Sequence, residues 1–189
     1  MAKTSAEPVK QLRRGWTTGA CATAATKAAF TALLTGEFPD PVSITLPKGQ
    51  TPSFALCLEG KGEGWAQAGI VKDAGDDPDV THGATIIATL RLAAAGTGVT
   101  FEAGDGVGKV TKDGLPIAPG EPAINPVPRQ MIATHLGALA ERCAVAADFD
   151  VTLGIEGGEA LAARTWNPRL GILGGLSILG TTGVVVPYS

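Results

Sequence analysis

The densest group of side chains that could do chemistry lies in one short segment, residues 73–83. Several carboxylates and one imidazole fall within it, and such groups can bind a divalent cation or transfer a proton. Their spacing does not fit an EF-hand loop, and a polar turn in which Asp side chains accept bonds from loop amides explains them equally well. Crowded carboxylates repel one another unless a partner neutralises them, so both interpretations stay open. The candidates are Asp73, Asp76, Asp77, Asp79 and His82.

A second candidate site is the start of an alanine-rich stretch, where Thr17, Thr18 and Gly19 precede Cys21. Free amides and the helix dipole at a helix start favour an anionic ligand, and small residues let that ligand approach the backbone. The alternative is a capped helix packed closely against a sheet, which explains the alanines as well. Cys21 could be a nucleophile with a pKa lowered by the dipole, but no histidine is paired with it in the nearby sequence. We therefore expect a small buried cysteine.

The third candidate runs from residue 167 to residue 189 and combines small and hydroxyl residues with one arginine. Such a run suits a loop that surrounds a polar ligand, with Arg169 placed to bind a carboxylate. A tight turn between two strands is the alternative. The residues of interest after Arg169 are Gly180, Thr181 and Thr182.

Two further features indicate structure rather than chemistry. Residues 104–109 contain three glycines and a lysine and look like a phosphate-binding loop, but the pattern after them predicts a strand rather than a helix. We therefore predict a hairpin around Gly104, Asp105 and Gly106. His135 lies between apolar residues on an expected helix, so we expect it to have a structural role.

The elements that must position these residues follow from the pattern of apolar and turn-forming residues. A helix is expected from Thr17 or Thr18 to about Leu34, with Gly36 as its stop, and a second from residue 128 to about 142. Because strands run in succession with only two main helices, we predict an α+β fold with a mixed, mostly antiparallel sheet packed against those helices. Strands are expected at residues 42–46, 53–59, 65–72, 85–92, 99–102, 107–111 and 150–155, a helical turn at 159–164, and apolar segments at 170–179 and 184–186.

Composition limits the classes of protein to which the chain can belong. With 189 residues, 44% of them apolar and 17% charged, the sequence predicts one folded domain over residues 15–189 after a flexible N-terminal tail over residues 1–14. A net charge of −3 argues against nucleic acid as the main partner. Three cysteines without paired spacing argue against a disulfide framework or a structural zinc site and favour the cytoplasm. We see no signal peptide and expect no membrane span.

The three candidate stretches together resemble signature segments of the CbiD family. The segments are residues 15–22, residues 73–83, and residues 167–171 with 180–183, and they occur in the family's order. The resemblance implies S-adenosylmethionine-dependent methylation at C1 of cobalt-precorrin-5B, giving cobalt-precorrin-6A in anaerobic cobalamin (vitamin B12) biosynthesis. Members of the family continue past Tyr188 and Ser189, so the chain is expected to be the N-terminal part of the family's length, with the C-terminal part absent.

The resemblance also implies ligands and roles. S-adenosylmethionine is the expected co-substrate, no protein-bound metal is expected, and the implied partners are a cobalt-corrinoid polycarboxylate, a second copy of the chain, or other enzymes of the pathway. We expect a catalytic proton to be handled by Asp77 or His82. Substrate or co-substrate binding is expected from Thr17, Thr18, Gly19, Cys21, Asp73, Asp76, Arg169, Gly180, Thr181 and Thr182. The carboxylates of the corrinoid macrocycle are expected to bind to one or more of five arginines: Arg13, Arg14, Arg91, Arg129 and Arg169.

Two alternatives remain. One is a non-catalytic tetrapyrrole-binding or assembly module that needs a missing half or a partner. The other is a divalent-metal hydrolase built on the cluster of residues 73–82, which we rank lower because no water-activating set of ligands is recognisable.

Overall fold

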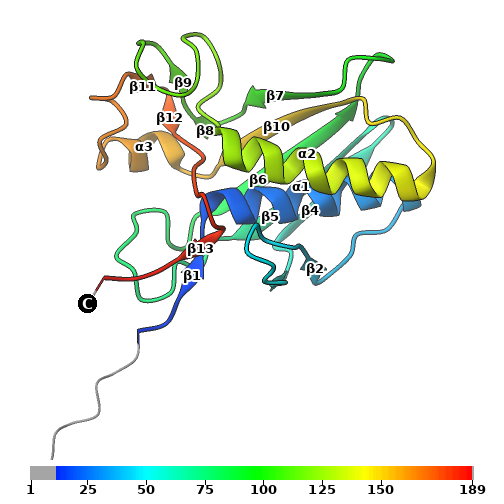
Figure 1. The fold of residues 1–189 in the computed structure, drawn as a ribbon, viewed down its shortest axis with the longest axis horizontal. Helices are drawn as coiled ribbons and strands as arrows, with labels where there is room; N and C mark the ends of the chain where they lie inside the picture. The colour runs from blue at the N-terminus through cyan, green and yellow to red at the C-terminus, as the bar shows by residue number, and fades with distance from the viewer. Residues whose placement is uncertain (1–11, 189) are drawn as a thin grey trace, which may run out of the picture.

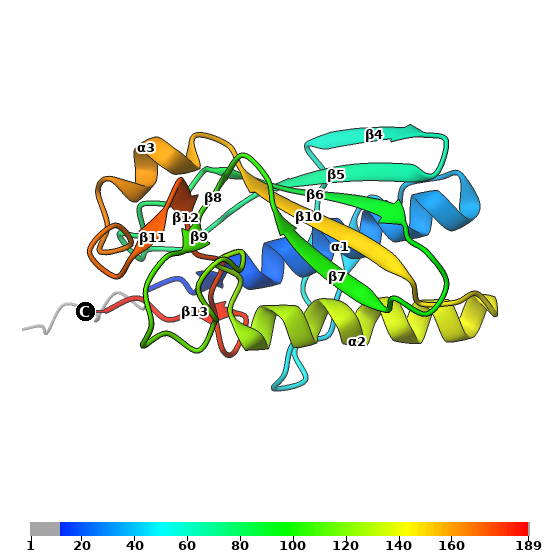
Figure 2. The ribbon, with the colours of Figure 1, turned by 90° about the horizontal axis from the view of Figure 1, so that it is seen from above.

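The computed structural model describes residues 12–188, and its centre is a five-stranded sheet with both long helices on one face (Figures 1 and 2). The strands pair in the order β4-β5-β6-β10-β7, all antiparallel except for the parallel pair of β10 and β7. The α+β prediction is therefore confirmed. The bounds are β4 (Leu58–Gly62), β5 (Trp65–Val71), β6 (Thr85–Leu92), β7 (Val99–Ala103), β10 (Phe149–Ile155), α1 (Thr18–Thr35) and α2 (Pro126–Cys143).

Four two-stranded pairs and a short helix complete the described fold. β1 pairs with β13 just before the start of α1, and β2 pairs with β3. β8 pairs with β12 and β9 with β11 beside the short helix α3. The bounds are β1 (Gly15–Trp16), β2 (Val42–Ser43), β3 (Ser53–Phe54), β8 (Gly106–Val107), β9 (Lys109–Val110), α3 (Gly158–Ala162), β11 (Ile172–Leu173), β12 (Gly175–Leu176) and β13 (Val184–Val185). In the part of the chain that is described, no helix combines the length and the apolar character of a membrane crossing.

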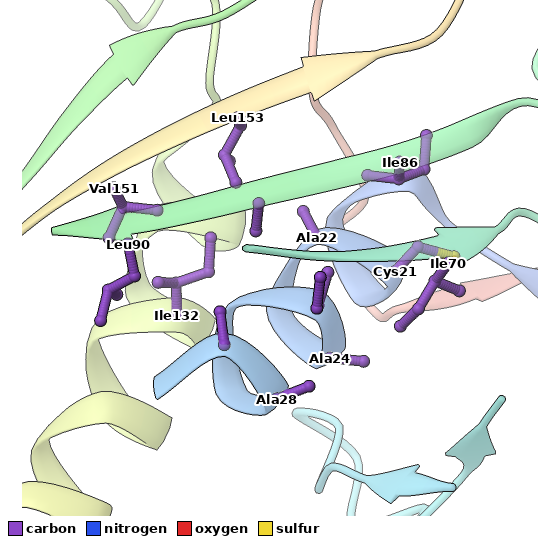
Figure 3. Packing of buried hydrophobic residues seen from close by; sticks show 14 of the residues in the cluster. Cys21, Ala22, Ala24, Ala28, Ile70, Ile86, Leu90, Ile132, Val151 and Leu153 are labelled. Atoms are coloured by element: carbon purple, nitrogen blue, oxygen red, sulfur yellow. The ribbon is translucent and has the colours of Figure 1, made fainter. Parts of the chain in front are cut away.

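Helix α1 is buried on nearly every side, and its composition explains why it can be. Thr17 is its N-cap, accepting a hydrogen bond from the amide of Ala20, and Gly36 ends it in the left-handed conformation. Alanines have no bulk beyond Cβ, so the sheet and α2 can both approach the helix axis closely. Figure 3 shows these alanines facing apolar residues of the sheet, with Ile132 of α2 alongside.

Helix α2 lies against α1 and the sheet with one buried stripe that includes Met131, Ile132 and Leu136. It begins two residues before the predicted start because Asn125 is the N-cap and proline suits the first turn. His135 has the structural role expected of it. Its Nδ1 bonds to the carbonyl oxygen of Met131 at 2.7 Å, and its Nε2 accepts the amide of Thr45 at 3.1 Å.

The hairpin predicted around Gly104, Asp105 and Gly106 is wrong. The strands on either side of it do not pair with each other, because β7 pairs with β10, β8 with β12 and β9 with β11. The glycines instead let the backbone cross over other main-chain segments. The predicted strand over residues 42–46 is also shorter, since its ladder with β3 covers only Val42 and Ser43.

Three glycines from distant parts of the chain meet backbone to backbone, and we call this contact the glycine junction: Gly106, Gly158 and Gly175. A Cβ on Gly106 would lie 2.0 Å from the carbonyl oxygen of Ile155, and one on Gly158 would lie 2.2 Å from the carbonyl oxygen of Gly106. A Cβ on Gly175 would lie 2.3 Å from the carbonyl carbon of Gly106. No side chain fits here, so the junction fixes α3 and β12 against the end of the central sheet.

We expect Gly158→Ala to lower the free energy of unfolding by more than about 2 kcal/mol, because the added methyl group would overlap main-chain atoms that cannot move aside. Gly137→Ala is the matched control. A Cβ there has no neighbour within 4 Å, and the site is inside α2, so this variant should be about 0.5–1 kcal/mol more stable. Urea unfolding of both variants measures the difference. Equal stability of the two variants would contradict a rigid junction.

Candidate functional site

The three candidate stretches meet at one end of the molecule, the left end in Figure 1. The strand before α1 is the centre of this arrangement. The amide of Trp16 donates to the carbonyl oxygen of Asp73 at 2.7 Å, and that of Thr17 donates to the carbonyl oxygen of Gly183 at 2.9 Å. Residues 13–19 therefore run between the acidic loop, residues 73–83, and the final residues of the described chain.

Arg13 neutralises one side of the acidic loop. Its guanidinium donates to both carboxylate oxygens of Asp73, at 2.5 and 2.9 Å, and its amide donates to Asp76 at 2.7 Å. The hydrogen bond from Arg13 is the main reason that the pKa of Asp73 falls to about 2. Arg13 belongs to the stretch predicted as a tail, of which residues 1–11 lie outside the described residues. Its partners explain how the carboxylates of the loop can crowd together.

Lys72 neutralises the other side of the loop from within the core. Its side chain is 1% exposed, and its ammonium donates to Asp79 and, at 2.7 Å, to the hydroxyl of Thr81. Burial alone would raise the pKa of Asp79, but the hydrogen bonds from Lys72 and Thr81 outweigh it and hold that pKa below its ordinary value. The turn interpretation therefore accounts for Asp73, Asp76 and Asp79.

Asp77 and His82 differ from the other members of the loop. Within residues 12–188, Asp77 has no ion pair or side-chain hydrogen bond, and its side chain is half-buried. The imidazole of His82 is 52% exposed, and its Nδ1 accepts the amide of Ala74 at 3.1 Å. That bond leaves Nε2 as the protonated nitrogen of the neutral ring. These two residues keep groups free for a ligand.

The start of α1 has less freedom than its sequence suggests. The amide of Gly19 donates to the carbonyl oxygen of Leu179 at 3.1 Å, and Thr17 caps the amide of Ala20. Thr17, Gly19 and their neighbour Thr18 are buried, so the chain itself occupies the position an anion would take. Cys21 is 0% exposed, and burial raises the pKa of its thiol to about 12, which leaves it a packing role.

The third stretch divides into a buried and an exposed part. Gly180 touches the start of α1, since a Cβ on it would lie 2.4 Å from the hydroxyl oxygen of Thr17. Thr182 exchanges hydrogen bonds with the backbone of Val184, whereas Thr181 is exposed. Arg169 is also exposed and lies over the indole of Trp166, with 4.7 Å between its guanidinium carbon and the ring centroid. Arg169 and Thr181 are thus the accessible members of this stretch.

A large cavity, which we call the hollow, was not predicted from the sequence. It has a volume of about 1290 Å³ and opens over the face of the sheet that the long helices leave bare. Thr85, Ile87 and Thr89 of β6 form its floor, and the glycine junction closes one end of it. The ionisable groups among its lining residues that carry charge at neutral pH are all acidic. They are Asp105, Glu156 and Glu159.

A signal for the hollow was present in the strands. In β6 the residues that face the helices are Ile86, Ala88 and Leu90. The residues that alternate with them, Thr85, Ile87 and Thr89, include two threonines. In β10 a threonine and a glycine alternate in the same way with buried apolar residues. Because side chains alternate across a strand, such a pattern indicates a second face that is not part of the core. The apolar pattern of residues 85–92 predicts a strand, but by itself it does not show which face of that strand is open.

Comparison with known proteins identifies the lineage. The model of the CbiD family matches residues 5–187. The chain belongs to the CbiD family. Its similarity to named relatives is high: it is 68% identical over 178 residues to the cobalt-precorrin-5B C(1)-methyltransferase of Paramagnetospirillum magneticum and 66% identical over 179 residues to that of Brucella canis. These alignments cover 94% and 95% of the chain but 50% and 49% of the relatives.

A solved structure supports the fold of this CbiD-family chain. The 1.9 Å crystal structure of the cobalamin biosynthesis protein CbiD from Archaeoglobus fulgidus matches it with a TM-score of 0.71 and 31% identity. That match covers 94% of the chain and 56% of the other protein. The chain therefore spans about half the length of the relatives it matches. In residues 12–188, no three His, Cys, Asp or Glu side chains come together as metal ligands.

The ion pair of Asp73 predicts a loss of stability in acid. The folded-state pKa of Asp73, about 2, lies below its ordinary value of 3.8. The contribution of this carboxylate is therefore complete above pH 4 and is lost as the pH falls towards 2. We expect wild type to be more stable than Asp73→Asn at neutral pH and the gap to close between pH 4 and 2. High salt should also reduce the difference in stability between wild type and Asp73→Asn, because the ion pair of Arg13 and Asp73 is partly exposed.

Thermal unfolding between pH 7 and 2 measures this gap. Asp113→Asn is the control, because Asp113 is exposed and has no ion pair within residues 12–188. A gap for Asp73→Asn that stays constant across the range would show that the charge of Asp73 is not what holds the loop to Arg13.

Proposed function

We propose that this chain takes part in S-adenosylmethionine-dependent methylation of C1 of cobalt-precorrin-5B, giving cobalt-precorrin-6A. Relatives at 66–68% identity bear the name of this activity. At that identity, residues that contact substrates in the aligned half are expected to be shared. The observation that carries the proposal is the hollow, which is large enough for a cofactor-sized ligand and is lined by polar side chains.

The charge of the hollow favours the methyl donor over the corrinoid. S-adenosylmethionine carries a positive sulfonium and an ammonium group, and its ribose offers two hydroxyls that carboxylates bind well. Asp105, Glu156 and Glu159 would attract such a ligand, whereas they would repel a macrocycle that bears many carboxylates. When bound, the donor supplies a methyl group for in-line displacement by a carbon nucleophile.

The residues of the hollow are held in place before any ligand arrives. The amide of Glu156 donates to the carbonyl oxygen of Thr85 at 2.9 Å, which fixes the main chain as it leaves β10. Gln67 donates to the hydroxyl of Thr89 at 2.7 Å, so the floor is a preformed polar surface. Methyl transfer to carbon depends on alignment more than on a nucleophilic side chain, and a rigid floor suits that requirement.

The corrinoid would meet a different surface. Arg13 and Arg129 are engaged with Asp73 and Glu121, so their charges are already balanced. Arg169 is exposed and has no carboxylate partner within residues 12–188. It follows α3, and Gly174, a few residues further along, lines the hollow. We assign Arg169 to a carboxylate of the macrocycle, with the indole of Trp166, which is 68% exposed, as an adjacent apolar surface.

The acidic loop would handle a substrate proton. Its last residues lead directly into β6, whose first residue Thr85 lines the hollow. Asp77 is the better base of the pair, because His82 can accept a proton at Nδ1 only by giving up its bond to the amide of Ala74. His82 would then donate from Nε2. The three free thiols fit the cytoplasmic location expected for this reaction.

We expect the chain to bind S-adenosylmethionine with a micromolar dissociation constant, measured by isothermal titration calorimetry. Glu156→Gln and Glu159→Gln should each weaken binding roughly tenfold, because each removes one charge-assisted contact. Glu63→Gln, in the exposed turn between β4 and β5, should leave binding unchanged. Equal affinities of all three variants for S-adenosylmethionine would show that the hollow is not the binding site of the methyl donor.

We expect Asp77→Asn to lower the turnover number at least tenfold while corrinoid binding is unchanged, because a general base contributes about two orders of magnitude or more. His82→Gln should have a smaller effect on the same number, since it retains a donor. Methyl transfer from labelled S-adenosylmethionine to cobalt-precorrin-5B measures turnover, and absorbance titration measures corrinoid binding. Unchanged turnover with unchanged binding in both variants would rule out a proton-handling role for the loop.

A second candidate function rests on the length of the chain, about half that of its relatives. The chain could be a non-catalytic tetrapyrrole-binding or assembly module that needs another half or a partner to act. The same calorimetric titration separates the two functions. Binding of S-adenosylmethionine favours the methyltransferase, whereas corrinoid binding without binding of the donor favours the module.

A further inference from the structure

A second cavity, which we call the groove, lies on the opposite side of the sheet from the hollow. Its volume is about 510 Å³, and it is bounded by α2, by Lys27 of α1 and by residues 45–47 after β2. Helix α1 lies against the covered face of the sheet (Figures 1 and 2). The hollow is lined from the other face of the sheet, so the groove and the hollow open on different sides of that layer. A ligand in the groove cannot share a site with one in the hollow.

Two cationic side chains, those of Lys27 and Arg142, line the groove. Burial and the nearby charge of Arg142 both lower the pKa of Lys27, so the two groups are close enough to repel each other. No acidic residue lines the groove, and in residues 12–188 neither cation has a carboxylate partner. Lys27 donates to the carbonyl oxygen of Ser43 at 2.6 Å, which holds its ammonium in place. The last turn of α2 suits a cation at Arg142, but this does not account for a second one beside it.

The rest of the lining is mostly apolar, with a few polar groups. Leu46, Met131 and Leu139 supply apolar surface, and Gln130 and Thr134 supply hydrogen-bonding groups. The wall is also preformed, because His135 ties residue 45 to α2 through the amide of Thr45. An apolar wall with a small number of placed polar groups is the usual form of a small-molecule site, and 510 Å³ is within the usual range of volumes.

We propose that the groove binds a small carboxylic acid with an apolar body, the carboxylate between Lys27 and Arg142 and the body along α2. An anion there relieves the repulsion between the two cations, and the apolar body covers Met131 and Leu139. Because the groove is separated from the hollow by the sheet and α1, this ligand is neither the methyl donor nor the methyl acceptor. This proposed site can therefore be tested independently of the proposed methyl transfer.

The probe is octanoate, followed by two-dimensional nitrogen–proton NMR of the labelled chain. We expect saturable shifts of the amide of Thr45 and of amides around Met131, with little change at Thr85 in the hollow. Arg142→Gln should weaken octanoate binding roughly tenfold, since it removes one charged hydrogen-bonding partner. Lys27→Gln should weaken it to a similar extent, and its circular dichroism checks that α1 remains folded. Arg164→Gln, an exposed arginine beyond α3, is the matched control and should bind as wild type does.

Two further probes separate the parts of the proposal. Inorganic phosphate has the charge without the apolar body, and 1-octanol has the body without the charge, so each should bind at least tenfold more weakly than octanoate. Equal binding of octanol would overturn the role of the cations, and equal binding of phosphate would overturn the role of the apolar wall. Shifts that survive unchanged in both Arg142→Gln and Lys27→Gln would overturn the site.

Discussion

The rest of the structure depends on the burial of α1. This helix must be small on every side, because the sheet packs on one side of it and α2 on another. Alanines satisfy that requirement at a low cost in side-chain entropy. Once α1 and α2 have covered one face of the sheet, only the other face can be open to a large ligand. The position of the hollow is thus a consequence of how the core is packed.

The end of the molecule where the candidate stretches meet combines rigid and accessible groups. Arg13 and Lys72 neutralise the acidic loop from outside and from within, and the glycine junction fixes α3 beside it. Most of the small residues there are therefore needed for backbone contact. Asp77, His82 and Arg169, the groups for which we propose chemical roles, extend from this framework. A preorganised framework with a few free groups is what alignment of two bound substrates requires.

The sequence was informative about elements and less so about their partners. Helix α1 and strand β6 could be predicted because alanine content, caps and apolar runs are local properties. The partners of β8 and β9 could not be predicted, because these strands pair with residues more than sixty positions away. The glycine pattern between β7 and β8 is typical of a hairpin, and it therefore suggested the wrong pairing. Ion pairs such as Lys72 with Asp79 depend on burial, which local composition does not reveal. The groove could not be predicted from the sequence, because its residues come from three separate segments of the chain: α1, α2 and residues 45–47.

The pairing of β1 with β13 has a consequence for how the chain folds. Gly15 lies opposite Val185, so the strand that leads into α1 finds its partner only among the last described residues. A contact between such distant residues must close a very long loop, and its entropic cost is met late in folding. During synthesis, β1 and the start of α1 would therefore lack their contacts with β13 until residues 184–185 have left the ribosome. The same closure brings residues 14 and 186 next to each other, so segments from the two ends of the described fold lie side by side.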